Sequence, residues 1–110
     1  MCDDQKIIGV QICACICGQD GVISQTEEDV IFEQFSKLMG LTTSQINSAF
    51  DNFFTSEQQI DDYLSLVLEE DLKIAILDIA RISAAADGLD IRENIALQRA
   101  IIFWRLPNVY

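Results

Sequence analysis

Two long segments of the chain are apolar on nearly every side of a helix, and each is followed closely by an Asp-Gly pair. The first segment covers residues 4–17 and the second covers residues 70–86. A helix without a polar face is typical of the buried centre of a bundle, and an Asp-Gly pair favours a tight turn. The two segments therefore predict central helices that the rest of the chain must cover.

Four further helices are predicted from capping boxes, in which a polar side chain and one three residues later satisfy the first N–H groups of a helix. The four pairs are Ser24/Glu27, Thr42/Gln45, Ser56/Gln59 and Asp90/Glu93. They predict helices over residues 25–39, 43–54, 57–68 and 91–105. No stretch alternates between apolar and polar residues, so we expect an all-α fold: one helical bundle of about six helices in a single domain, 1–110.

The spacing of apolar residues also predicts which side chains the covering helices bury. The predicted sets are Ile31, Phe35 and Leu38; Ile46, Phe50, Phe53 and Phe54; Ile60, Leu64 and Val67 or Leu68; and Ile95, Leu97, Ile101 and Trp104. Of the four cysteines, Cys13, Cys15 and Cys17 are expected to be small buried hydrophobic residues rather than metal ligands. Cys2 lies near the start of the chain and is the expected reactive thiol.

Composition restricts the function. The chain has no histidine, which excludes imidazole catalysis and the usual zinc-protease sites. No Ser, Thr or Cys has a residue near it that would activate it as a nucleophile, so we predict a binding module rather than an enzyme, without catalytic residues or a certain cofactor. The acidic start and the shortness of the apolar segments argue against a signal peptide or a membrane span, so the expected location is the cytoplasm.

Charge is distributed unevenly along the 110 residues, which carry a net charge of −11. Residues 1–71 contain two basic and fourteen acidic residues, whereas residues 72–110 contain five basic and four acidic ones. Such a surface repels phosphate backbones and anionic lipids and attracts cations and basic proteins. The expected partner is therefore a protein, with a second copy of the chain as one candidate, and neither nucleic acid nor a membrane.

An internal repeat relates the two ends of the chain. Segments 12–28 and 79–94 each run from an apolar helix through Asp-Gly to a capping box, which indicates two duplicated units, residues 7–39 and 70–105, linked by helices within 42–68. An approximate twofold between the units would place both turns at one end of the bundle. The carboxylates of Asp20, Glu27, Asp87 and Glu93 would then converge and could share Ca²⁺ or Mg²⁺, or bind a basic partner. The alternative is that they are ordinary turn and capping residues.

The residues of both turns argue against a calmodulin-type calcium loop. Asp20 to Glu27 matches the second half of such a loop, but Ile16 and Gly18 stand where the first ligands would be, and Ser83 and Ala85 stand there in the second turn.

The paired motifs resemble the TerB-like, or tellurite-resistance, family. That family carries, twice, an alanine-rich helix ending in Ala-Asp-Gly and a Glu that opens the next helix. Here residues 84–88 read Ala-Ala-Ala-Asp-Gly and residues 17–21 read Cys-Gly-Gln-Asp-Gly, with Glu27 and Glu93 downstream. The resemblance implies a non-enzymatic stress-response role, with metal binding by the acidic residues and association with other proteins. A structural adaptor without a ligand, for example a phage-encoded one, is the alternative.

Overall fold

Capping residues mark several of the helix ends in the part of the chain that the structure describes. The computed structural model describes residues 3–18, 23–55, 60–86 and 91–105, and within these ranges it contains helices and no strand. The helices are α1 (Asp3–Cys17), α2 (Gln25–Met39), α3 (Thr43–Thr55), α4 (Ile60–Leu64), α5 (Glu70–Ala85) and α6 (Ile91–Trp104). No helix in these ranges is long and apolar enough to cross a bilayer. The prediction of an all-α bundle of about six helices is confirmed.

The start and end of α2 show the local chemistry most clearly. Ser24 is extended and forms a complete capping box with Glu27. Gly40 ends the helix in the left-handed region at φ 69°, where its lack of a β-carbon removes the steric penalty. Thr42 and Gln45 exchange a second pair of capping hydrogen bonds at the start of α3. The predicted box at Ser56/Gln59 lies outside the described residues. So do Asp90 and the side chain of Glu93, which form the other predicted box.

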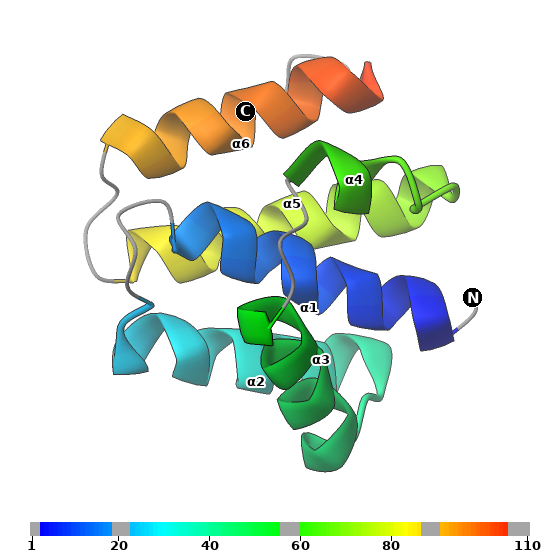
Figure 1. The fold of residues 1–110 in the computed structure, drawn as a ribbon, viewed down its shortest axis with the longest axis vertical. Helices are drawn as coiled ribbons and strands as arrows, with labels where there is room; N and C mark the ends of the chain where they lie inside the picture. Colours follow the sequence, from blue (N-terminus) through cyan, green and yellow to red (C-terminus); the bar gives the residue numbers. More distant parts are fainter. Residues whose placement is uncertain (1–2, 19–22, 56–59, 87–90, 106–110) are drawn as a thin grey trace.

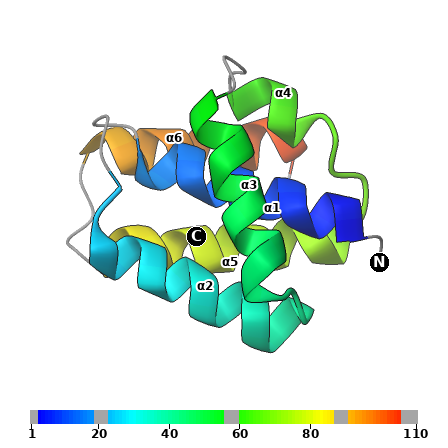
Figure 2. The same ribbon diagram turned by 60° about the horizontal axis from the view of Figure 1, so that its bottom comes forward.

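The two apolar helices form the centre of the bundle, as predicted. α1 and α5 lie side by side and run in the same direction, with α2 and α6 on opposite sides of the pair (Figure 1). α3 crosses α1 and α2, and α4 lies against α1 and α6 (Figure 2). The buried side chains that the two central helices contribute include Val10, Ile12, Cys13, Ala14, Ile16, Leu72, Ile76, Ile79, Ala80 and Ala84.

Gly9 allows α1 to approach α5 closely. A β-carbon at this position would lie 2.8 Å from both Cγ1 and Cδ1 of Ile76, and 3.2 Å from Cε1 of Phe35. Carbon atoms that are not bonded to each other pack at about 3.5–4.0 Å, so any larger residue at position 9 would displace its neighbours. Four residues further along, the Cys13 thiol donates a hydrogen bond to the carbonyl of Ile76, at 3.6 Å.

Trp104 joins α6 to α4. Its indole Nε1 donates a hydrogen bond of 2.8 Å to the carbonyl oxygen of Leu64, the last residue of α4. The ring is buried, and the Nζ of Lys73 on α5 lies 6.0 Å from its centroid. This bond satisfies a carbonyl that the end of the short helix leaves without a partner inside the helix.

Two residues that were predicted to be buried, Leu38 and Ile95, are instead exposed. Leu38 is 66% exposed. The buried residues of α2 follow one another at every fourth position, and this row winds around the helix away from Leu38: Glu27, Ile31, Phe35 and Met39. Ile95 is 62% exposed because it lies on the side of α6 opposite Leu97, and Ile82 on α5 is also exposed.

α4 is shorter than the predicted helix over residues 57–68. It ends at Leu64, and the chain turns at Ser65 and Leu66. Val67 then fills the core position, whereas Leu68 is exposed. Phe50 is buried and Phe53 partly buried, as predicted, and the side chain of Phe54 lies outside the described residues.

We predict that Gly9→Val lowers the free energy of unfolding by about 1–3 kcal/mol, since it overpacks the contact between α1 and α5. Urea denaturation followed by circular dichroism would measure the change. Asn47→Val on the exposed side of α3 is the matched control and should change stability by less than about 0.5 kcal/mol. Equal effects of the two substitutions would contradict close packing at Gly9.

Candidate functional site

The helix ends that flank the two Asp-Gly turns lie at one end of the bundle. α1 and α5 end there, and α2 and α6 begin there, in both views (Figures 1 and 2). Asp20 and Asp87 themselves lie outside the described residues. Glu93 belongs to α6, but its side chain is outside the described part as well. Glu27 is therefore the one predicted ligand whose side chain can be placed.

The Glu27 carboxylate is buried and takes part in the cap of α2. The residue is 5% exposed, and its Oε1 accepts a hydrogen bond of 2.9 Å from the backbone N–H of Ser24. In return the Ser24 Oγ accepts the backbone N–H of Glu27 at 3.1 Å. The capping prediction for this pair is confirmed. The shared acidic site stays a prediction, because the other three carboxylates cannot be placed beside Glu27.

The described residues contain no group of three or more Cys, Asp or Glu side chains that could hold a metal ion. The cysteines of α1 follow the expected pattern, since Cys13, Cys15 and Cys17 are free thiols buried in the core. Burial raises the pKa of the Cys15 thiol from 9.0 to about 12. Burial, with a smaller effect from the neighbouring Cys15, also raises the pKa of Cys13. Cys2 lies outside the described residues.

Most basic side chains of the described part contact groups of the same chain. Arg99 forms a two-point ion pair with Asp61, with Nε 3.0 Å from Oδ1 and an Nη 2.7 Å from Oδ2. The hydrogen bond from Arg99 holds the pKa of Asp61 below its usual value. Lys37 pairs with Glu33, Arg81 lies 3.9 Å from Asp78, and Lys6 donates to the carbonyl of Met39.

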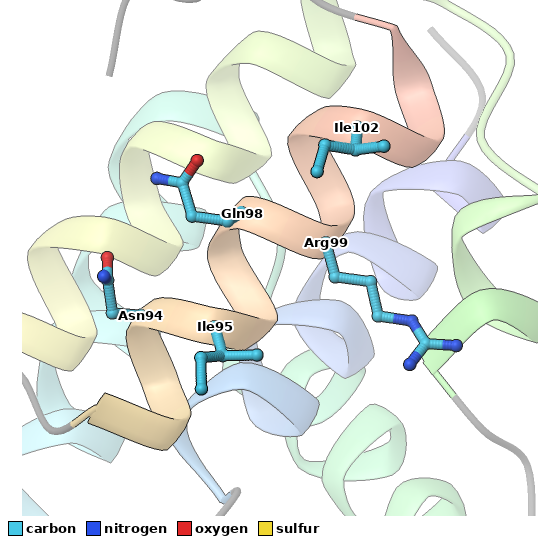
Figure 3. A pocket seen from close by; sticks show the side chains of 5 residues that line it. All are labelled: Asn94, Ile95, Gln98, Arg99 and Ile102. Atoms are coloured by element: carbon cyan, nitrogen blue, oxygen red, sulfur yellow. The ribbon is translucent and has the colours of Figure 1, made fainter.

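The outer side of α6 forms a surface feature that the sequence interpretation missed. A shallow hollow of about 380 Å³ is lined by Asn94, Ile95, Gln98, Arg99 and Ile102 (Figure 3). No carboxylate belongs to this lining, so it does not supply the acids of an acid–base site. The spacing of seven between Ile95 and Ile102, on the side opposite Leu97 and Trp104, is the signal that could have revealed it.

Comparisons of the chain with protein-family models, with curated proteins and with solved structures give no match.

We expect Glu27→Gln to keep the stability of the protein, because a Gln oxygen can accept the same N–H of Ser24. Glu27→Ala removes that acceptor and should cost about 1 kcal/mol. Chemical denaturation of both variants would measure this. If Gln destabilised the protein as much as Ala, the negative charge rather than the capping bond would be the stabilising feature.

A second prediction concerns the buried thiol of Cys15. Its pKa is about 12 in the folded protein and 9.0 without burial, so above pH 9 it ionises first in the unfolded chain. Its contribution to stability is therefore complete below pH 9 and falls as the pH rises toward 12, by up to about 1.4 kcal/mol per pH unit. Urea denaturation between pH 8 and 11 should show a shallower decline for Cys15→Ala. An equal decline in both proteins would contradict the raised pKa.

Proposed function

We propose that the chain is a non-enzymatic binding module of the TerB-like type that acts in a stress response. The ligand site is the end of the bundle where α1 and α5 stop and α2 and α6 start. The arrangement of these four helix ends is the observation that supports the proposal most directly, because the chain places an Asp-Gly turn after each central helix (Figure 1).

The ligand follows from the charge at these turns. Asp20, Glu27, Asp87 and Glu93 offer hard oxygen donors, which Ca²⁺ and Mg²⁺ prefer. Two carboxylates about 4 Å apart repel each other by roughly 4 kcal/mol at an effective dielectric near 20. A divalent cation would remove this repulsion, and a basic group of a partner protein would do so in part. Neither turn contains Lys, and Arg92 is the basic residue nearest in sequence to the second turn.

The proposal predicts that Ca²⁺ or Mg²⁺ raises the melting temperature of the protein and that EDTA reverses the rise. A cation at about one hundred times its dissociation constant stabilises the fold by about 2.7 kcal/mol, which corresponds to roughly 10 °C or more for a domain of this size. Differential scanning calorimetry at constant ionic strength would measure the shift. Asp20→Asn and Asp87→Asn should each remove most of it without loss of helix content.

Asp51→Asn on the exposed side of α3 is the matched control, since it removes one carboxylate far from these turns in sequence. It should leave the cation response unchanged. Glu27→Gln adds a sharper test, because it keeps the capping bond and removes the charge. If neither cation changes the melting temperature, the cation site is excluded, and the structural adaptor without a ligand becomes the better interpretation.

A further inference from the structure

We infer that the outer face of α6 is a self-association surface, through which two copies of this chain form a twofold dimer. The face consists of Ile95, Gln98, Arg99 and Ile102, which line the hollow described above together with Asn94 (Figure 3). This inference does not depend on the proposed cation site, which lies on a different set of residues.

The exposed apolar residues of this face are arranged as a binding stripe. Ile95 and Ile102 are 62% and 74% exposed and lie two helical turns apart on the same side of α6. Phe103 extends the apolar surface on the flank and is also exposed. The opposite side of the helix is already packed into the core through Leu97, Ala100, Ile101 and Trp104. Large side chains at this spacing are typical of a helix that packs against another helix on both sides.

The order of residues along the stripe suits a second copy in particular. Gln98 and Arg99 stand midway between Ile95 and Ile102, so the stripe reads apolar, polar, apolar from either end. When two copies of α6 pack antiparallel about a twofold axis at this midpoint, each Ile95 meets the Ile102 of the other copy. Twofold interfaces require such self-complementarity. A Gln amide carries both donors and an acceptor, so Gln98 can also pair with its own copy.

The charge distribution favours the same partner at the same place. Two chains of net charge −11 repel each other, and the repulsion is smallest where their least acidic surfaces meet. α6 belongs to the last third of the chain, in which five basic residues balance four acidic ones. The remaining charge on the stripe, Arg99, is neutralised by its two hydrogen bonds to Asp61 on α4. Two copies can therefore approach through α6 without bringing their acidic regions together.

The interface would extend beyond the stripe. α6 has fourteen residues and is thus about 21 Å long. One face of a helix of this length does not by itself supply the buried area of about 800 Å² per partner that a stable interface takes. The adjoining surface of α5, which contacts α6 and belongs mostly to the less acidic last third of the chain, would supply the rest of the buried area.

Sedimentation equilibrium of the full chain tests the inference. The wild type should reach twice the monomer mass of 12.4 kDa as its concentration rises. Ile95→Glu and Ile102→Glu should each weaken dimerisation at least tenfold, because each variant places two mutually repelling carboxylates, one from each copy, in the apolar interface. Both residues are exposed, so circular dichroism should show unchanged helix content. Leu38→Glu adds the same charge at an exposed leucine of α2, on the opposite side of the bundle, and should leave the dimer intact.

Cross-linking adds a test of the twofold geometry. In a Cys2→Ser background, Gln98→Cys should give a disulfide-linked dimer under mild oxidation, because this residue lies beside the proposed axis. Leu38→Cys in the same background should stay monomeric on a non-reducing gel. A wild type that remains monomeric up to millimolar concentration, or a dimer that Ile102→Glu does not weaken, overturns the inference. If the protein is monomeric, the occupant of this face is a partner of a different sequence and not a second copy.

Discussion

The close contact between α1 and α5 is the feature on which the rest of the bundle depends. Gly9 removes the side chain that would hold the two helices apart, and the thiol of Cys13 bonds across to the Ile76 carbonyl. Because both helices are apolar on nearly every side, their contact with each other covers only part of their surface. α2, α3, α4 and α6 supply the remaining cover, each with one buried side and one exposed side.

Much of this architecture could be predicted from the sequence because the helix boundaries have local chemical signals. Ser24 with Glu27, Thr42 with Gln45, and Gly40 mark their helix ends through bonds within a few residues. The orientation of each outer helix could not be predicted as well. An apolar side chain such as Leu38 or Ile95 is compatible with burial, but the neighbouring helices determine which row of residues faces the core. α4 has no Gly or Pro to end it, so no local signal marks where it stops.

The candidate site shows a different limit of sequence reasoning. Duplication of the helix–turn–helix unit predicted that both turns belong to one end of the bundle, and the flanking helix ends do lie together there. Residue identity alone cannot separate a ligand from a cap, because carboxylates serve both purposes. Glu27 illustrates this, since it was predicted both as a ligand and as a cap, and its oxygen Oε1 is seen to complete the capping box of α2. The α6 face was missed for a simpler reason: Ile95 was predicted to be buried, and its spacing of seven from Ile102 was not considered.

Trp104 has a consequence for how the behaviour of the bundle can be observed. It is the single tryptophan of the chain, and it is buried where α6 meets α4, with its indole N–H bonded to Leu64. Tryptophan emission depends on the polarity around the ring, so intrinsic fluorescence reports on this one junction. A red shift that precedes the loss of helical circular dichroism would show α6 detaching while the central pair stays folded. The protein thus contains its own optical probe for stepwise rather than all-or-none unfolding.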